Sequence, residues 1–401
     1  MLLMKQIAKI ISTYTADVSG VCSALFELGG MTVMHDASGC NSTYSTHDEP
    51  RWYDADSMIY VSGLSEMEAV MGDDEKLITD IVSAANELHP DFIAIAGTTI
   101  PMMIGTDFQA ISAIVKKRTN IPAFGFKTNG MHSYISGAGM AFEALAKHMV
   151  PEKDAQNIPQ DTAHDHIGVN ILGLTPLDFA INGTDWSIRN QLEMNDFTVI
   201  SSWAMHSSME QIRQSAHADV NLVVSYCGLP AAKVLKERFG IPYVVGTPIG
   251  DTLTNQILDD LKTAAQSGDC IISYQNTKFA PQNVTDADVV LIGESVNTCS
   301  LASAITQFTG HSTGVICPID TDRAILGSGG SMESDETELV PLLKNAKVIV
   351  ADPLYQPICP THAKFVALPH MAFSGRIYQK EIPDLVAHSE AFLEHVRTCL
   401  L

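Results

Sequence analysis

Short apolar runs alternate with helix-length amphipathic stretches along most of the chain. Residues 91–97 (DFIAIAG) predict a buried strand, residues 107–118 a helix, and residues 120–126 (NIPAFGF) the next strand. Strands that alternate with helices of this length are typical of a parallel sheet covered by helices on both faces. The pattern therefore predicts an α/β fold.

The same alternation restarts twice, after a polar, proline-containing stretch at 151–165 and after Ser267-Gly268. Apolar runs predict four strands in each later unit, at 166–173, 197–202, 221–225 and 241–245, and then at 287–293, 314–317, 346–351 and 364–368; a helix at 382–399 ends the chain. We expect three Rossmann-like domains, each a mainly parallel sheet flanked by helices, at 1–160, 161–265 and 266–401. Ligands of such sheets bind at the carboxyl ends of strands, so we expect a ligand cleft between the domains.

Charge narrows the classes of partner. The chain has 401 residues, with 46 acidic and 24 basic ones, which gives a formal net charge of −22. A surface this acidic argues against binding nucleic acid or an anionic membrane. No run of about 18 apolar residues occurs, and the first residues lack a secretory signal, so we expect a cytoplasmic protein with no membrane span.

Nucleotide-binding motifs are absent from the sequence. There is no Walker loop, and no GxGxxG follows an expected strand; Gly137-Ala138-Gly139 is too short. We therefore expect that this chain binds neither ATP nor NAD.

The eight cysteines form neither a dense disulfide framework nor a CxxC zinc pattern. Cys40 follows the apolar run 30–34, and Gly39 before it lets the backbone approach a ligand closely. Cys22 lies upstream on an expected helix at 21–28. A thiolate from a helix and one from a strand-end loop would converge on one metal centre; the alternative is that Cys22 is a buried core thiol.

Four further residues follow expected strands, where a ligand would bind. Cys227, Glu294, Cys299 and His370 all lie in or just after loops at strand ends. We expect them to line the cleft, with His370 as a metal ligand or proton donor. The alternative for Cys227 and Cys299 is that they are thiols at helix N-termini without a function in chemistry.

Several segments together resemble the nitrogenase component 1 family, which includes cofactor-assembly scaffolds and dark tetrapyrrole reductases. In chain order they are VSGLSE and VMGDDEKL (61–66, 70–77), TTIPMMIGTD (98–107), VNILG (169–173), Asp185 with RNQLE (189–193), and NLVV with FGIP (221–224, 239–242). The resemblance runs over nearly the whole chain. It implies three α/β domains, a dimer, an iron–sulfur cluster held at the subunit interface by cysteines of both partners, and electrons from a separate ATP-dependent iron–sulfur reductase.

The resemblance carries over only partly to the cluster ligands. Cys40 matches the Gly-Cys ligand of the family's interface cluster. The family's upstream cluster cysteine falls near Asp17, one helical turn from Cys22, and its third falls at Thr99. These departures argue against a nitrogenase-type eight-iron cluster.

The ligands of nitrogenase's large catalytic cofactor carry over partly as well. The cysteine ligand falls at Ser225, two residues before Cys227, and the histidine ligand falls at or next to His370. The departure at Ser225 argues against dinitrogen reduction.

These observations lead to a first hypothesis and open alternatives. In a homodimer, Cys22 and Cys40 of two chains supply four thiolates, enough for one 4Fe-4S cluster at the interface. The alternatives are that Asp17 replaces or joins them, or that the cluster uses only the pair of Cys40 thiolates with other ligands. The chain would then be an oxidoreductase that takes electrons from an ATP-dependent iron–sulfur reductase and reduces a substrate in the interdomain cleft. The substrate would be a tetrapyrrole, a small unsaturated or sulfur-containing molecule, or a bound metallocofactor.

Three other hypotheses stay open. In the first, the chain is a scaffold that holds a metallocofactor precursor without turnover, with Cys227 and His370 as transient ligands. In the second, it is one half of a heterodimer whose partner supplies the cysteines missing near Asp17 and Thr99. In the third, it is an α/β protein without a cluster.

Overall fold

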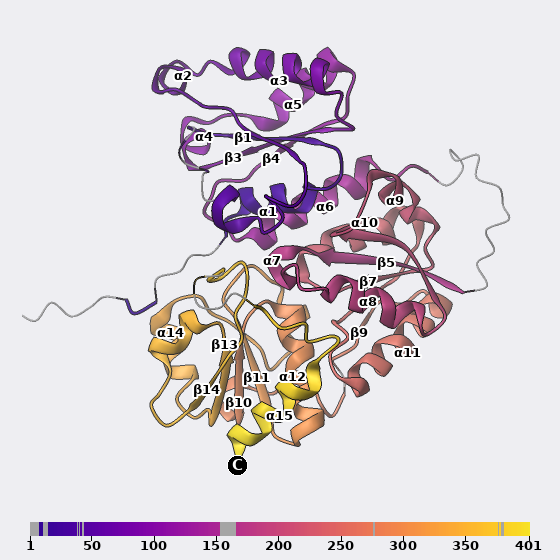
Figure 1. Ribbon diagram of the computed structural model, residues 1–401, viewed down its shortest axis with the longest axis vertical. Helices are drawn as coiled ribbons and strands as arrows, with labels where there is room; N and C mark the ends of the chain where they lie inside the picture. The colour runs from indigo at the N-terminus through magenta and orange to yellow at the C-terminus, as the bar shows by residue number, and fades with distance from the viewer. Residues whose placement is uncertain are drawn as a thin grey trace, which may run out of the picture.

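The computed structural model describes residues 8–10, 15–37, 39, 41, 44–152, 166–275, 277–375, 377 and 381–401. The predicted alternation is confirmed: strands and helices form three sheets, all of whose paired strands run parallel, with helices around them (Figure 1). The sheet orders are β2-β1-β3-β4, β6-β5-β7-β8-β9 and β12-β11-β10-β13-β14.

The first unit holds the four-stranded sheet. Its strands are β1 (Met31–His35), β2 (Met58–Val61), β3 (Ile93–Gly97) and β4 (Ala123–Phe126). Its helices are α1 (Asp17–Leu25), the π-helix η1 (Tyr44–Asp48), α2 (Glu66–Met71), α3 (Asp74–Leu88), α4 (Thr99–Ile104), α5 (Phe108–Thr119) and α6 (Tyr134–His148).

The second unit holds a five-stranded sheet. Its strands are β5 (Ile167–Leu174), β6 (Phe197–Ala204), β7 (Val220–Val223), β8 (Tyr243–Val245) and β9 (Ile271–Ile272). Its helices are α7 (Pro176–Phe179), α8 (Thr184–Glu193), α9 (Met209–Gln214), η3 (Ser215–His217), η4 (Tyr226–Gly228), α10 (Leu229–Phe239) and α11 (Asp251–Ser267).

The third unit holds the other five-stranded sheet. Its strands are β10 (Val289–Ile292), β11 (Thr313–Cys317), β12 (Ser331–Met332), β13 (Val348–Ala351) and β14 (Lys364–Ala367). Its helices are η5 (Val284–Asp286), α12 (Ser295–Thr309), α13 (Arg323–Leu326), α14 (Glu336–Leu342), η6 (Pro353–Ile358) and α15 (Ser389–Leu400).

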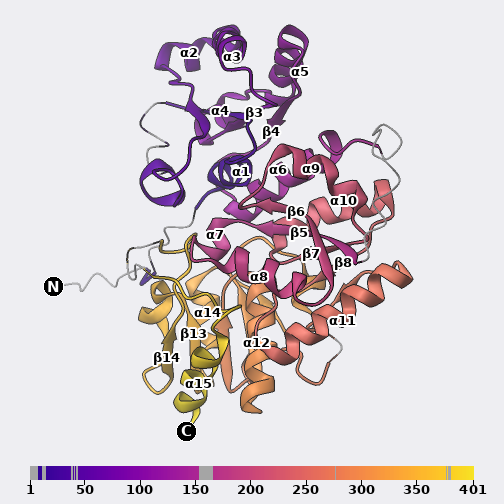
Figure 2. The ribbon, with the colours of Figure 1, turned by 45° about the vertical axis from the view of Figure 1, so that its right-hand side comes forward.

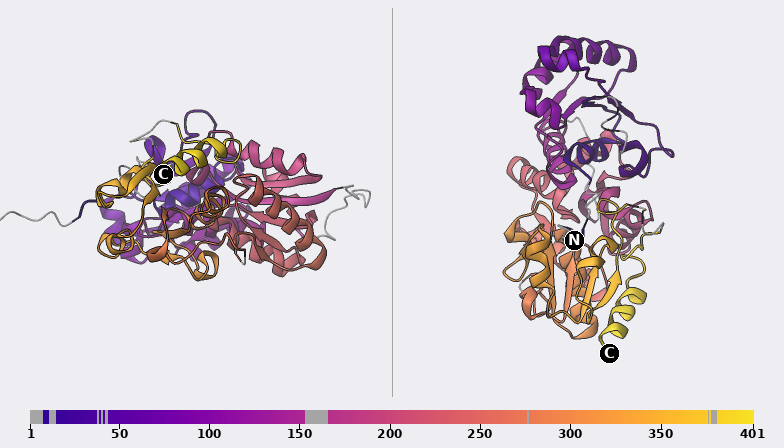
Figure 3. Two further views of the ribbon diagram at one scale, coloured as in Figure 1. Left: turned by 90° about the horizontal axis from the view of Figure 1, so that it is seen from below. Right: turned by 90° about the vertical axis from the view of Figure 1, so that its left-hand side faces the viewer.

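The three units follow one another along the molecule. The first forms one end, the second the middle and the third the other end, where the C-terminus lies (Figures 1 and 3). Helices α1 and α6 lie where the first unit meets the second (Figure 2). A single buried core runs through this junction, because residues of α1, α6, β5 and α12 belong to one hydrophobic cluster.

Two glycines let α1 and α6 approach closely. A Cβ added at Gly137 would lie 1.8 Å from the backbone oxygen of Asp17, and one at Gly20 would lie 2.1 Å from that of Tyr134. Every residue of α1 is buried. The first turn of α6 is therefore held against the N-terminus of α1.

Some boundaries differ from those expected from the sequence. The expected strands fall within two or three residues of those observed, but α11 was not expected, although its buried leucines, isoleucine and alanine recur at helical spacing. Strand β9 pairs with β8, so the second sheet extends past residue 265. The last helix begins at Ser389 rather than 382, because the Asp384 side chain accepts the N–H groups of Val386 and Ala387 and forms a separate turn.

Candidate functional site

Loops from two sheets bring acidic and thiol side chains together in the interior. Asp178 lies on α7 directly after β5, and Cys227 lies on η4 directly after β7. Glu294 and His370 follow β10 and β14 of the third unit. Because all these strands are parallel within their sheets, the residues lie at carboxyl ends, where α/β folds bind ligands.

Asp178 is the centre of this cluster. Its Oδ1 accepts a hydrogen bond from the Tyr134 hydroxyl at the start of α6, and its Oδ2 accepts one from Thr175 Oγ1 at 3.1 Å. The Cys227 thiol lies 3.9 Å from Oδ2, and His370 Nε2 lies 3.5 Å from Oδ1. Asp178 thus stands between the thiol and the imidazole, and all three units of the fold contribute to the cluster.

A hydrogen bond from its backbone N–H fixes His370, whereas the ring nitrogen Nε2 has no hydrogen-bond partner among the described residues. Asp352, after β13, accepts the N–H of His370 at 2.8 Å and the hydroxyl of Ser374 at 2.7 Å. The ring packs on Phe373 with centroids 4.4 Å apart. Nε2 is buried and, despite its 3.5 Å approach to Asp178, makes no hydrogen bond of good geometry.

Glu294 supplies a second buried carboxyl group. It precedes α12 and accepts the N–H groups of Val296 at 3.1 Å and Asn297 at 2.8 Å, as a residue that caps a helix does. It also accepts the N–H of Tyr226 from the second unit at 2.9 Å.

The surroundings of Glu294 tune its acidity. Burial, reinforced by the charge of Asp178, raises the pKa of Glu294 to about 7, although its backbone hydrogen bonds act in the opposite direction. A carboxyl group with this pKa gains and loses a proton near neutral pH, which suits acid–base work. Burial and Asp178 also raise the pKa of Tyr134, so that hydroxyl stays protonated.

One cavity is lined by residues of the cluster, and a second lies near it. The small one, of about 60 Å³, is lined by Asp178, Glu294, Asp352 and His370 among others, and it is large enough to hold water. A larger one of about 800 Å³ lies where the three units meet, and it is large enough for an organic ligand. Tyr226 connects them: its N–H donates to Glu294, and it also lines the larger cavity.

The predicted cleft cysteines are core thiols in this structure. Cys227 and Cys299 are fully buried, and burial raises the pKa of each thiol well above its ordinary value. Cys299 lines neither of the two cavities. Sequence reasoning pointed to Cys227, Glu294 and His370, which the fold does bring to one region, and their functional roles stay predictions.

The predicted cluster ligands have a different standing. Cys40 lies outside the described residues. Cys22 is fully buried on α1, and burial, together with the charges of Glu49 and Asp48, raises the pKa of its thiol. A thiolate ligand must be deprotonated, so these surroundings disfavour cluster ligation by Cys22. Within the described part of the chain, no group of three or more His, Cys, Asp or Glu side chains is arranged to hold a metal ion.

The two other positions suggested for cluster ligands meet at one loop. The buried carboxylate of Asp17 accepts the N–H groups of Asn129 at 2.9 Å and Gly130 at 2.8 Å. Thr99 Oγ1 donates to the carbonyl of Asn129 at 2.8 Å. Hydrogen bonds to the 129–130 loop therefore occupy the positions at which the family resemblance expects thiolates.

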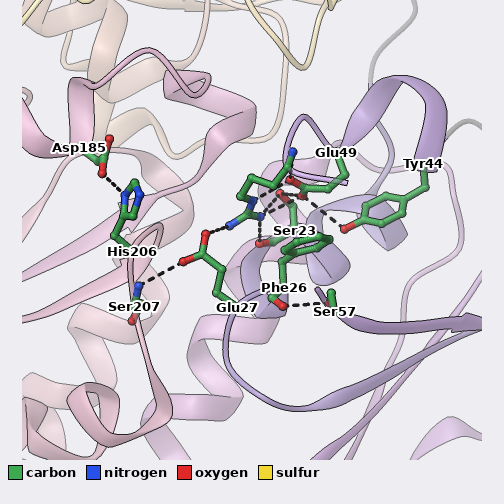
Figure 4. Close-up of polar contacts among 10 residues, drawn as sticks. Ser23, Phe26, Glu27, Tyr44, Glu49, Ser57, Asp185, His206 and Ser207 are labelled. Carbon is green, nitrogen blue, oxygen red and sulfur yellow. Dashed lines mark hydrogen bonds and ion pairs between the residues drawn. The ribbon is translucent and has the colours of Figure 1, made fainter. Parts of the chain in front are cut away.

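A buried cation ties the segment after Cys40 to α1 and to the second unit. The Arg51 guanidinium donates to both oxygens of Glu49 at 2.7 and 2.9 Å and to Glu27 Oε1 at 2.8 Å. The other oxygen of Glu27 accepts the N–H of Ser207, next to His206 of the second unit (Figure 4). Such a buried pair of charges fixes geometry more than it adds stability.

Comparison with known proteins agrees with this architecture. Residues 19–297 match the model of a family described as nitrogenase component 1 type oxidoreductases. The chain belongs to this family. The match covers the first unit, the second unit and the start of the third as far as α12.

The relatives of known role include cofactor-assembly proteins and a nitrogenase subunit. The nitrogenase iron-molybdenum cofactor biosynthesis protein NifE of Rippkaea orientalis is 23% identical over 65% of this chain and 53% of its own length. NifE of Clostridium pasteurianum is 27% identical over 57% of this chain and 51% of its own. The nitrogenase molybdenum-iron protein alpha chain of Methanosarcina barkeri is 23% identical over 54% of this chain and 41% of its own. The chain thus spans about half the length of the curated relatives it matches.

A solved structure described as nitrogenase Cp1 at pH 6.5 has the same fold. It superposes with a TM-score of 0.65 at 16% identity, over 100% of this chain and 95% of that one. In the part of the chain that the structure describes, no helix is long and apolar enough to cross a membrane.

Proposed function

We propose that this chain is the substrate-binding component of a nitrogenase-like reductase. It holds a substrate in the cavity where the three units meet, supplies protons from the cluster around Asp178 and Glu294, and receives electrons from an ATP-dependent iron–sulfur reductase. The observation that carries the proposal is the buried group of Asp178, Glu294, Tyr134 and His370, which the Tyr226–Glu294 hydrogen bond links to the wall of a cavity of about 800 Å³. Family membership supports reduction as the reaction class.

In this proposal, the reductase supplies the electrons and residues of this chain supply the protons. Reduction of a double bond adds two electrons and two protons to the substrate, and the reductase supplies the electrons. Glu294, whose pKa of about 7 leaves it partly protonated at neutral pH, gives up a proton and is reprotonated from solvent through the small cavity. The hydroxyls of Tyr134 and Thr175 hold Asp178, whose charge keeps the pKa of Glu294 raised.

The complete burial of Cys22 within the core of one chain argues against a symmetric cluster held by Cys22 and Cys40 of two copies. Two copies of Cys40 alone supply two of the four ligands of a 4Fe-4S cluster. We therefore favour a heterodimer whose partner chain supplies the remaining ligands. Cys40→Ser should lose most of the iron of the anaerobically purified assembly, whereas Cys22→Ser should keep it; iron loss in Cys22→Ser, or full iron in Cys40→Ser, would contradict this assignment.

A scaffold role is the second candidate, favoured by the similarity to NifE proteins. A scaffold needs Cys227 and His370 to reach one metallocofactor. Asp178 and the Tyr134 hydroxyl lie between the thiol and the imidazole, so a bound cofactor would have to displace a buried, hydrogen-bonded carboxylate. The filled space favours the reductase role.

Turnover tests the proposal directly. The chain, its genome-neighbouring partner chain and reductase would be co-purified anaerobically and supplied with ATP, dithionite and a small-molecule extract of the host cells. ATP-dependent dithionite oxidation that requires this chain, with a reduced product in mass spectrometry, is the expected result. Glu294→Gln should lower that rate by roughly 10²–10⁴-fold, the usual contribution of a general acid.

Glu237→Gln, an exposed carboxylate on α10, is the matched control and should keep the full rate. A scaffold would instead carry a bound iron–sulfur precursor and give no reductase-dependent turnover. An undiminished rate in Glu294→Gln would remove Glu294 from the proton path.

A further inference from the structure

The larger cavity has a charge pattern that selects its ligand. It is about 800 Å³ in volume and is lined by the loop before α6, by α6, by the segment from η4 to α10, and by the loops after β11 and around β12. Among the described residues, its lining includes the carboxylates Glu143, Asp320 and Glu333 but no lysine or arginine. His132 is the one basic side chain among these lining residues. Walls of one charge sign focus the field inside a cleft, so an anion is repelled and a cation is attracted.

Two of these carboxylates keep acceptor capacity at the wall. Asp320 Oδ2 accepts both the N–H and the hydroxyl of Ser133, at 2.9 and 2.6 Å, and this contact fixes the carboxylate. Its Oδ1 has only His132 Nδ1 at 3.8 Å, which is too long for a hydrogen bond. Glu333 is half-buried and forms no hydrogen bond or ion pair with the described residues, whereas Glu143 is already paired with Lys147 at 2.6 Å.

The rest of the lining suits alkyl groups attached to a positive charge. Tyr226 offers an aromatic ring, and Met131, Met140 and Met332 offer thioethers that adapt to irregular apolar shapes. We propose that the substrate held in this cavity is an organic cation that carries an amine or quaternary ammonium group. The inference rests on the proposed function and deepens it: polycarboxylates, including carboxylate-bearing tetrapyrroles, do not fit the charge of the cavity.

Dye binding to the full-length protein tests the inference without turnover. Thioflavin T, an organic cation whose fluorescence rises when it is held rigidly, should bind saturably with one dye per chain, and the anionic dye 8-anilinonaphthalene-1-sulfonate should not compete for the cavity. Asp320→Asn with Glu333→Gln should weaken thioflavin T binding at least tenfold. Glu237→Gln with Asp269→Asn removes the same charge from exposed positions outside the cavity and should leave it unchanged.

A variant that adds a positive charge tests the same inference if the double variant folds poorly. Met140→Lys places a cation at the wall of the cavity without removing either carboxylate, and it should weaken binding to a similar extent. Equal loss of binding in the cavity and control double variants would reveal non-specific attraction to an acidic protein and overturn the inference. Tighter binding of the anionic dye would overturn it as well.

The two proposals fail separately. Thioflavin T binding that follows the cavity variants, without any reductase-dependent turnover, would retain the cation site and reject the reductase role. Turnover that depends on Glu294, with no loss of dye binding in Asp320→Asn/Glu333→Gln, would retain the reductase and reject the cation site.

Discussion

The raised pKa of Glu294 makes the stability of the protein depend on pH in a calculable way. Its ordinary value is 4.5, and the folded protein raises it to about 7. Below about pH 4.5, both folded and unfolded chains carry the proton. As the pH rises, the unfolded chain releases this proton first, so the folded state loses stability until the pH passes about 7.

The magnitude follows from the two values. At roughly 1.4 kcal/mol for each pKa unit, the difference between 4.5 and about 7 corresponds to on the order of 3 kcal/mol. About 2 kcal/mol of this loss falls between about pH 5.5 and about pH 8.5, because the unfolded chain is already mostly ionised at the lower limit. Glu294→Gln removes the titration, and it adds a pH-independent cost of about 1–3 kcal/mol because the amide cannot accept from both Val296 and Asn297 as the carboxylate does.

Urea unfolding series over this pH range, under reducing conditions, measure the effect. The stability of the wild type minus that of Glu294→Gln should fall by roughly 2 kcal/mol from the lowest to the highest pH. The exposed control, Glu237→Gln, should give a flat difference. Parallel curves for the wild type and Glu294→Gln would refute the argument that burial and Asp178 hold a proton on this residue.

Three further predictions concern packing. Gly137→Ala should destabilise the protein by about 3 kcal/mol or more, since its Cβ would lie 1.8 Å from backbone, whereas Gly139→Ala, whose nearest atom is a flexible ring carbon at 3.3 Å, should cost little in thermal denaturation. Arg51→Met should cost about 3–5 kcal/mol in urea unfolding because it leaves a fully buried carboxylate unpaired; Arg118→Met, which breaks an exposed pair, should have little effect, and equal costs would contradict the importance of burial. The Cys22 thiol should resist iodoacetamide in the native protein and react after unfolding; fast native labelling would contradict its burial.

The buried strands were accessible from local sequence because parallel strands covered on both faces leave continuous apolar runs, whereas the order of the strands within each sheet was not predicted. The runs at 91–97 and 287–293 became the central strands β3 and β10 in this way. Helix α11 was not predicted, although its buried apolar residues recur at regular helical spacing in the sequence.

The sequence indicated some residues of the candidate site but not others. Cys227, Glu294 and His370 were found because they follow strands, which is a local signal. Asp178 also follows a strand, since it lies on α7 directly after β5, but it was not singled out. Tyr134 carried no local signal, because a tyrosine at the start of a helix is an ordinary feature. Only the packing of α6 against the second unit buries them together, and the residues in contact are far apart in the sequence.

We infer that Glu294, a buried carboxyl group at the meeting point of the units, holds an exchangeable proton near neutral pH. Infrared difference spectra between wild type and Glu294→Gln, recorded from about pH 5 to about pH 9, would follow the carbonyl band of that carboxyl group. We expect a protonated band that titrates with a midpoint near 7 and shifts to lower pH in Asp178→Asn. A Glu294 that is fully ionised at about pH 5.5, or a midpoint that Asp178→Asn leaves unchanged, would contradict this inference.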